Sequence, residues 1–427
     1  MYLYMIICII GSGGREHAIC KTISLSSKIS KIYCMPGNAG TQQLAENIDL
    51  DINNFEEVLK FLKDSKIDLV IVGPEKPLVN GIVDYLESNN IKVFGPRKIP
   101  SQLEGSKTFT KNICKKYNIP TAKFGIFEKK ENTINFLKNS KFPIVIKADG
   151  LAAGKGVYIS KNLSEAKEAV NEIFDGKFGL AKKILVEEFL NGEEMSFFIV
   201  CDGKNFKIFK TAQDHKRVNE GDEGKNTGGM GAYSPSGLIN EILESKIINK
   251  IISPTLKAIE EMGEKYKGFL YAGLMILDNE PFLIEYNVRM GDPECQTILP
   301  LLKTDLIDVC NACCDENLEN LNIEWREEKS LCIVLCSRGY PEKFANNVKI
   351  DNLNNLKLNN NDFIFHAGTK EKGNEIFSNG GRVLNFVSLS NSFKDSRERA
   401  INLINQLNWK NGFFRKDIGF KIIDKWE

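Results

Sequence analysis

A carboxylate and an amide side chain placed two residues apart could bind a divalent metal ion in this chain. Polar and apolar residues alternate from Leu283 to Val288, which predicts a strand with Glu285 and Asn287 on one face. Carboxylate and amide oxygens are hard ligands suited to Mg²⁺, and Arg289 follows where it could meet a phosphate held by the metal. A surface strand with ordinary charges is the alternative, since this short motif is common.

A glycine turn near the N-terminus has the form of an anion-binding loop. The apolar run Met5–Ile10 is too short to span a bilayer and predicts a buried strand, which the turn Gly11–Gly14 joins to a helix. The last glycine of a dinucleotide fingerprint is replaced here by Glu16, and the strand Ile32–Cys34 does not end in an acidic residue. The turn therefore favours a monophosphate over a dinucleotide, with a tight turn that binds nothing as the alternative.

Two lysines and a second glycine-rich stretch could surround a triphosphate. Lys107 lies near the start of a predicted helix, and the predicted strand Phe142–Lys147 leads into the stretch Asp149–Gly156. This stretch is not a Walker A motif, because only three residues separate Gly150 from Gly154 and no Ser or Thr follows the next lysine. A strand lysine with a glycine-rich flap can still cover a triphosphate. A solvated lysine and a plain hairpin are the alternatives.

An acidic junction and a polar glycine-rich segment complete the candidate site. The predicted strand Ile184–Val186 runs into Glu187–Glu194, where backbone groups could read an adenine edge and a carboxylate could bind ribose hydroxyls. An ordinary acidic turn is the alternative. The segment Asn219–Pro235 is too rich in glycine and polar residues to form core, so we expect a mobile loop over a site.

Alternating strands and helices in the first 100 residues would position the N-terminal part of this site. Residues Asn54–Lys63 predict a helix that begins with an asparagine cap, and Ile67–Val72 predict a buried strand of a parallel sheet. Glycine turns follow the predicted strands, and ligands gather at that edge of open α/β sheets.

The later elements follow a different order. Residues Ile247–Met262 predict a helix kinked near Pro254, and Phe269–Ile276 predict a strand that pairs with Pro281–Val288. From about residue 330, short strands with turns precede a closing helix, and no pattern there assigns chemistry.

Length and composition restrict the class of protein. A chain of 427 residues suggests two to four domains. The 57 basic and 56 acidic residues show no excess charge that would indicate nucleic acid or a membrane surface as partner. The 11 cysteines are scattered and lack a second pair at zinc-finger spacing, which predicts reduced, buried thiols in the cytoplasm. We therefore expect small-molecule partners, no nucleic acid and no membrane.

Eight motifs spread over almost the whole chain resemble the glycinamide ribonucleotide synthetase family of the ATP-grasp superfamily. They are GSGGREH at 11–17, PGNAGT at 36–41, GPEKPLVNG at 73–81, KADGLAAGKGV at 147–157, EEFLNGEE at 187–194, DHKR at 214–217, NTGGMGAYSP at 226–235 and RMGDPE at 289–294. Members of this family more often carry Phe at the position of Met290. Many other ATP-grasp enzymes place a second metal carboxylate on the strand occupied here by Leu274–Ile276.

The resemblance implies a mixed α/β and α+β multidomain fold. It implies an N-terminal Rossmann-like parallel-sheet domain for substrate at 1–105 and an ATP-grasp central domain at 106–125 and 192–328. An ATP-grasp flap domain is implied at 126–191 and a small C-terminal α+β domain at 329–427.

The reaction implied by the resemblance joins glycine to 5-phosphoribosylamine at the expense of ATP, through a glycyl phosphate, in purine biosynthesis. The implied cofactors are ATP and Mg²⁺ or Mn²⁺, and we expect a cytoplasmic monomer. A carboxylate is a poor acyl donor until it is phosphorylated, and phosphoryl transfer asks chiefly for alignment and charge neutralisation. A protein nucleophile is not needed.

Site residues follow from the resemblance by position in this sequence. The catalytic candidates are Arg289, Lys147, Asp214 and Asp292. The ATP-binding candidates are Lys107, Lys147, Gly154, Glu187, Glu188, Leu190 and Glu194, and the metal ligands are Glu285 and Asn287. The substrate-binding candidates are Gly11, Gly13, Gly14, Arg15, Asn38, Glu75, Asp214, Arg289, Gly291 and Asp292.

Three other functions stay open at this point. A related purine-pathway ligase would use the same ATP-binding parts with another acceptor. A nicotinamide-dependent oxidoreductase is suggested by the first glycine turn, although its third glycine and acidic partner are missing. A nucleotide sensor without catalysis is the third. Histidines at 17, 215 and 366 predict neither a zinc site nor a Ser-His-Asp set.

Overall fold

The computed structural model describes residues 4–151, 156–177, 179 and 183–426. Its N-terminal part is a five-stranded parallel sheet with the order β3-β2-β1-β4-β5, which confirms the predicted Rossmann-like sheet. The strands are β1 (Met5–Gly11), β2 (Ile29–Pro36), β3 (Glu46–Asn47), β4 (Leu69–Val72) and β5 (Val93–Phe94). Four helices accompany them: α1 (Gly14–Ile23), α2 (Phe55–Asp64), α3 (Glu75–Asn80) and α4 (Ile82–Glu87). The Asn54 side chain caps α2, as its sequence predicts.

The central sheet is antiparallel and carries the predicted metal strand at one edge. Its order is β11-β10-β16-β17, and its strands are β10 (Glu193–Asp202), β11 (Phe206–Ile208), β16 (Lys267–Leu277) and β17 (Glu280–Asn287). The predicted pairing is confirmed, with Glu285 opposite Gly273 and Asn287 opposite Tyr271.

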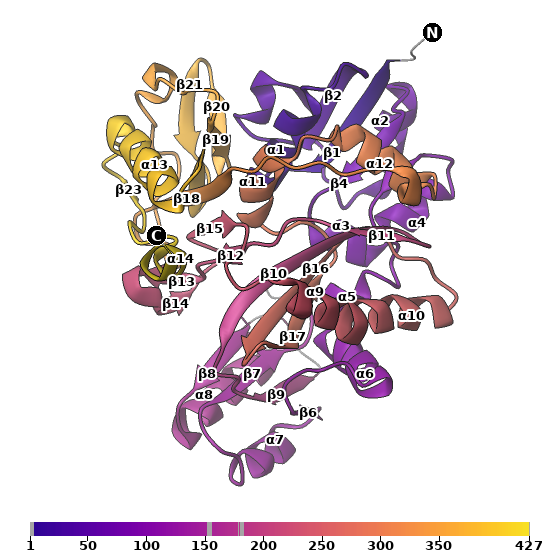
Figure 1. Cartoon of the computed structure of the whole chain (residues 1–427), viewed down its shortest axis with the longest axis vertical. Coiled ribbons are helices and arrows are strands. Elements are labelled where there is room, and N and C mark those ends of the chain that lie inside the picture. The colour runs from indigo at the N-terminus through magenta and orange to yellow at the C-terminus, as the bar shows by residue number, and fades with distance from the viewer. Residues whose placement is uncertain (1–3, 152–155, 178, 180–182, 427) are drawn as a thin grey trace.

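A second four-stranded sheet forms the flap. Its order is β6-β9-β7-β8, and its strands are β6 (Phe124–Phe127), β7 (Ile144–Ala148), β8 (Val157–Ser160) and β9 (Ile184–Glu188). Helices α7 (Lys130–Leu137) and α8 (Leu163–Phe174) pack on it and enclose a separate small hydrophobic core. Figure 1 shows this sheet at the opposite end of the molecule from the N-terminal sheet, with the central sheet between them.

Helices join the three sheets. They are α5 (Gln102–Gly105), α6 (Lys107–Tyr117), α9 (Glu241–Ile247), α10 (Ser253–Glu261), α11 (Glu294–Ile298) and α12 (Leu306–Cys314). The helix predicted for Ile247–Met262 is interrupted by a π-helical turn at Ile248–Ile252, which ends two residues before Pro254.

The C-terminal sheet includes one strand, β15, from a segment for which we predicted a loop. Its order is β12-β15-β18-β22-β19, with β23 beside β18. The strands are β12 (Gln213–Asp214), β15 (Gly231–Ser234), β18 (Lys329–Ser337), β19 (Asp362–His366), β22 (Arg382–Ser390) and β23 (Gly412–Phe413). Helices α13 (Phe393–Leu407) and α14 (Phe420–Trp426) belong to the same end of the chain, and β20 (Thr369–Lys372) pairs with β21 (Glu375–Ser378).

The prediction of a mobile loop at Asn219–Pro235 was wrong for its last part. Residues Gly231–Ser234 form a strand whose four residues are all buried, and Arg217–Asn219 pairs with Glu223–Asn226 as a hairpin. A side chain on Gly231 would overlap the carbonyl of Cys332 on the neighbouring strand. Small residues therefore permit close packing of the strands here, rather than mobility.

The buried thiols agree with the sequence prediction. All 11 cysteines are free, and ten of them are buried, with Cys314 partly exposed. Within the described residues, we find no helix that is both long and apolar enough to cross a membrane.

Candidate functional site

The lysine of the flap sheet faces the predicted metal strand. The Nζ atom of Lys147, at the end of β7, lies 3.4 Å from the carbonyl oxygen of Ile284 in β17. The main chain joins the two sheets nearby, because Leu283 donates its N–H to the carbonyl of Pro120 and Thr121 donates its hydroxyl to the carbonyl of Leu283. The flap and the central sheet therefore meet at the candidate site.

The two predicted metal ligands present free oxygens on the same face of β17. Among the described residues, neither the Glu285 carboxylate nor the Asn287 amide has a hydrogen-bond or ion-pair partner, and both are partly buried. No cluster of three His, Cys, Asp or Glu side chains suited to a metal occurs in the described part of the chain. Two hard oxygen ligands fit a Mg²⁺-type ion that completes its shell with phosphate oxygens and water.

Both predicted phosphate lysines lie at the junction of helix α6 and the flap. Lys107 is the first residue of α6, and its Nζ donates to the carbonyl of Gly150 at 2.9 Å. Burial lowers the pKa of Lys107, although the nearby Glu285 carboxylate acts in the opposite direction. Lys147 forms an ion pair of 2.6 Å with Glu187 in β9. Gly154, predicted to contact ATP, lies outside the described residues.

The acidic junction after β9 contains two different kinds of residue. Glu187 is buried, whereas Glu188 is exposed and uses its side chain and its N–H to bond the backbone of Lys123. Within the described residues, the backbone of Leu190 has no hydrogen-bond partner. Leu190 therefore has backbone groups available to a base, while the N–H of Glu188 is already bonded.

Beyond the junction, Glu194 and Asp214 share one lysine. Lys216 forms an ion pair of 2.6 Å with Glu194 and holds the pKa of that carboxyl below its ordinary value. Burial raises the pKa of Asp214 to about 7, and the negative charges of Glu294 and Glu194 add to this effect while Lys216 opposes it. Asp214 is therefore a carboxyl group for which an added cation would be favourable.

Arg289 is held between two carboxylates from the N-terminal part of the chain. Its guanidinium donates to Glu75 at 3.2 Å and to Glu104 at 2.6 Å. Arg289 lowers the pKa of Glu75 to about 2, whereas burial raises the pKa of Glu104 to about 7. Gly291 follows closely, and a side chain there would overlap the Glu294 carboxylate.

The first glycine turn is bonded mainly to carboxylates of the protein itself. Gly13 donates its N–H to Glu16 at 2.6 Å, and Arg15 donates its N–H to Asp292 at 3.3 Å. The Arg15 side chain is buried and pairs with Glu16 at 2.6 Å. A side chain on Gly11 would overlap Glu16, and one on Gly14 would overlap Gln296 and Asn385. Glycine is thus required at both positions for packing.

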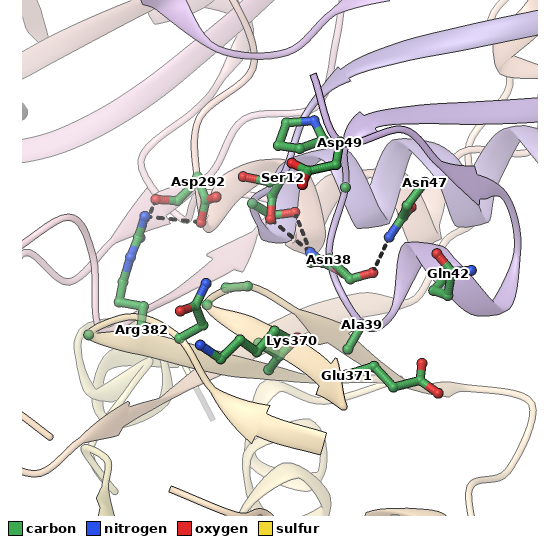
Figure 2. Close-up of a pocket in the computed structure, with 18 of the residues that line it drawn as sticks. Ser12, Asn38, Ala39, Gln42, Asn47, Asp49, Asp292, Lys370, Glu371 and Arg382 are labelled. Atoms are coloured by element: carbon green, nitrogen blue, oxygen red, sulfur yellow. Dashed lines mark hydrogen bonds and ion pairs between the residues drawn. The ribbon is translucent and has the colours of Figure 1, made fainter. Parts of the chain in front are cut away.

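A cavity of about 900 Å³ opens between this turn and the C-terminal domain. Figure 2 shows Ser12, Asn38 and Asp292 on one side of it and Lys370, Glu371 and Arg382 on the other. The Asn38 amide donates to the carbonyls of Ser12 and His366 at 2.9 Å, so it ties the two domains together at the cavity wall.

Two basic residues of this cavity were not predicted from the sequence. Arg382 donates to the carbonyls of Gly228 and Asp292 at 2.6 Å and lies 3.3 Å from the Asp292 carboxylate. Burial opposes the ionised form of Asp292, but Arg382 and Arg15 outweigh it and hold the pKa of that carboxyl below its ordinary value. Lys370 lines the cavity, and no ion pair engages it within the described residues. Neither residue belongs to a recognisable motif.

Comparisons with known proteins agree along the chain. The N, ATP-grasp (A) and C domains of the phosphoribosylglycinamide synthetase family match residues 5–104, 105–295 and 330–421. A phosphoribosylamine–glycine ligase of Mesorhizobium japonicum is 46% identical over 98% of this chain and 99% of its own length, and one of Brucella melitensis is 42% identical over 99% of both.

A solved structure gives the same result. The crystal structure of phosphoribosylamine–glycine ligase from Thermotoga maritima superposes with a TM-score of 0.84 at 33% identity, covering 97% of this chain and all of that one. Sequence and structure therefore place this chain in the phosphoribosylamine–glycine ligase family, whose domains are those of phosphoribosylglycinamide synthetase.

Proposed function

We propose that this chain joins glycine to 5-phosphoribosylamine in purine biosynthesis, with conversion of ATP to ADP and phosphate. One observation carries this proposal beyond family membership: Lys147 of the flap lies 3.4 Å from the backbone of the strand that bears Glu285 and Asn287. A nucleotide between the flap and this strand would have cationic and metal-binding groups on both sides of its phosphates.

The first chemical step is phosphorylation of the glycine carboxylate. A glycine oxygen attacks the γ-phosphorus of ATP, ADP leaves, and the resulting glycyl phosphate is then attacked by the sugar amine with release of phosphate. Lys107, Lys147 and Arg289 supply positive charge where negative charge develops. Closure of the flap would keep water away from the acyl phosphate.

A divalent ion fits the oxygen donors of β17. Glu285 and Asn287 would hold Mg²⁺ or Mn²⁺, and the bound ion would neutralise charge on the β- and γ-phosphates. Among their neighbours, Lys107 has its pKa lowered by burial, and Glu285 is close enough for its carboxylate to oppose that shift. The lysine and the metal ligands would therefore act on the same phosphates.

The base and sugar of ATP would lie along the junction after β9. Leu190 offers its unpaired backbone N–H and carbonyl to adenine. Glu188 could offer only its backbone carbonyl, because its N–H is bonded to Lys123, and the buried Glu187 would form the wall of the adenine site. Glu194 would accept hydrogen bonds from the ribose hydroxyls, while Lys216 lowers its pKa and keeps it ionised. Gly154 would cover the phosphates from the flap.

Glycine and the sugar phosphate would occupy the other end of the site. The carboxyl group of Asp214 would bind the glycine ammonium, and Arg289 would bind its carboxylate, with Gly291 and Asp292 beside them. The 900 Å³ cavity would take phosphoribosylamine, with its phosphate toward Lys370 and the partly paired Arg382.

The N-terminal turn would then contribute shape more than charge. Gly11, Gly13, Gly14 and Arg15 have protein carboxylates or packed side chains as neighbours, and the Asn38 and Glu75 side chains are bonded within the protein. We therefore propose that these residues form the wall of the cavity that orients the sugar. The phosphate would bind on the opposite, C-terminal side, next to Lys370 and Arg382.

The decisive experiment measures ADP formation with and without glycine in the presence of freshly generated phosphoribosylamine. We expect ADP only when both are present, together with glycinamide ribonucleotide. ADP formed with formate or bicarbonate instead would identify a related ligase. Nucleotide binding without turnover would indicate a sensor, and a thermal shift with NADH would revive the oxidoreductase alternative.

Compartment and assembly complete the proposal. Eleven free thiols are typical of a reducing compartment, which supports a location in the cytoplasm. We propose a monomer, because all the candidate site residues come from one chain, and light scattering would test this.

A further inference from the structure

A third lysine is buried beside the ATP-binding candidates and was not predicted to have a role. Lys111 lies one turn after Lys107 in helix α6, and its side chain is only 3% exposed. Its Nζ atom lies 2.5 Å from one oxygen of Glu187, and the other oxygen of Glu187 lies 2.6 Å from Lys147. One buried carboxylate is thus shared by two buried ammonium groups.

Lys111 also reaches the point where the flap leaves the central sheet. Its ammonium donates to the hydroxyl of Thr121, which in turn donates to the carbonyl of Leu283 at 2.6 Å. Phe124, at the start of the flap, places its ring 5.4 Å from the same ammonium. The Lys111 side chain of α6 therefore contacts Glu187 of β9 directly and is linked to β17 through the Thr121 hydroxyl.

The arrangement of Lys111, Glu187 and Lys147 explains how Lys147 could leave Glu187 and bind a phosphate instead. To bind the phosphates of ATP, Lys147 must weaken its ion pair with Glu187. A buried carboxylate left without a partner is strongly destabilising, so the exchange would be costly if Lys147 were the only cation. Lys111 provides a second partner for Glu187, because its side chain is only 3% exposed and lies 2.5 Å from the other carboxylate oxygen.

The directions of the pKa shifts of Glu187 and Lys111 agree with this geometry. Burial raises the pKa of Glu187, but Lys147 and Lys111 outweigh it and hold the carboxyl ionised. Burial lowers the pKa of Lys111, an effect that Glu187 opposes. With both lysines charged, the three groups carry one net positive charge next to the expected position of the triphosphate.

We propose that Lys111 is a positioning residue for ATP binding, which neutralises Glu187 so that Lys147 is released to the phosphates. This inference rests on the proposed function, because it requires an ATP site at the flap. It concerns a residue that would not touch the nucleotide itself.

The test compares nucleotide affinity in a set of variants by calorimetry with MgADP, and KM values by steady-state kinetics. Lys111→Met should weaken MgADP binding and raise KM for ATP by at least about tenfold, while KM for glycine changes little. Lys111→Arg should retain most of the affinity. The matched control is Lys115→Met, an exposed lysine of the same helix, which should behave as the unmodified protein.

A double variant separates positioning from general stability. Lys111→Met combined with Glu187→Gln removes the unpaired carboxylate, and should regain MgADP affinity relative to Lys111→Met alone. Equal MgADP affinity in Lys111→Met and the unmodified protein would overturn the inference, as would failure of both single and double variants to fold. If the unmodified protein neither binds MgADP nor turns over glycine, the proposed function fails instead.

Discussion

Arg289 donates a hydrogen bond of 2.6 Å to Glu104, and the same carboxylate accepts the N–H of Val288 at 2.8 Å. Glu104 belongs to helix α5, while Val288 and Arg289 directly follow Asn287, the predicted metal ligand at the end of β17. One carboxylate from outside the strand therefore fixes both the backbone and the guanidinium where glycine and phosphate are expected to meet.

We expect Glu104→Gln to reduce turnover by about tenfold to a hundredfold, because it removes a charged hydrogen bond worth roughly 1.5–3 kcal/mol. The amide oxygen can still accept the Val288 N–H, so the fold should persist. The measurement is kcat at saturating substrates and about pH 8, above the pKa of about 7 that burial gives Glu104, so that the carboxyl is ionised. Glu87→Gln is the control, since Glu87 forms an ion pair of similar length with the exposed Arg97, and neither residue belongs to the candidate site. Unchanged kcat in Glu104→Gln would show that Arg289 does not need this partner.

A second prediction concerns Glu285, one of the two proposed metal ligands. Glu285→Gln should raise the Mg²⁺ concentration needed for half-maximal ADP formation by about tenfold or more, because an ionised oxygen ligand is replaced by a neutral one. Excess Mg²⁺ should recover part of the rate, and chelation should abolish activity in every variant. The control is Glu280→Gln at the start of the same strand, where the carboxylate pairs with Lys246 and Lys250. Identical Mg²⁺ titrations for both variants would show that Glu285 does not bind the metal ion.

Strand β17 and its pairing with β16 were predictable from the sequence because their signal is local. Alternation of polar and apolar residues predicted β17 and its pairing with β16, and the Asn54 cap predicted α2. Such patterns depend only on neighbours in the chain.

The remaining parts of the site depend on contacts between distant segments. Arg382 reaches the carbonyl of Asp292 from 90 residues away, and Lys111 reaches Glu187 only after the flap has folded. No spacing in the sequence indicates either contact. The buried strand Gly231–Ser234 was missed for a related reason, because its glycine and small residues are typical of loops unless a neighbouring strand packs against them.

A third prediction separates the two ends of the site. Lys370→Met should raise KM for phosphoribosylamine by about tenfold and leave KM for ATP unchanged, because Lys370 lines only the cavity in which we propose that the sugar phosphate binds. Lys372→Met is a matched control two residues along β20, where the side chain is exposed and lies over Phe377. An equal rise of both KM values in Lys370→Met would argue for a general loss of structure instead.

The last prediction follows from the Asp214 carboxyl group, whose pKa burial raises from 3.8 to about 7. The folded protein therefore holds this proton more tightly than the unfolded chain does. The resulting contribution to stability is fully present below about pH 4 and is lost as the pH rises toward 7. Because the side chain is only partly buried, we expect an effect of about 1 kcal/mol.

Asp214→Asn should consequently increase the free energy of unfolding relative to the unmodified protein, and the increase should grow between pH 4 and pH 7. Urea unfolding at several pH values measures it. The same substitution should raise KM for glycine strongly, because the amide cannot pair with the glycine ammonium. Asp64→Asn, at the exposed end of α2, is the control for both measurements. If Asp214→Asn were less stable than the unmodified protein at pH 7, the Asp214 carboxylate would stabilise the fold. Its role would then be structural rather than the proposed binding of the substrate glycine.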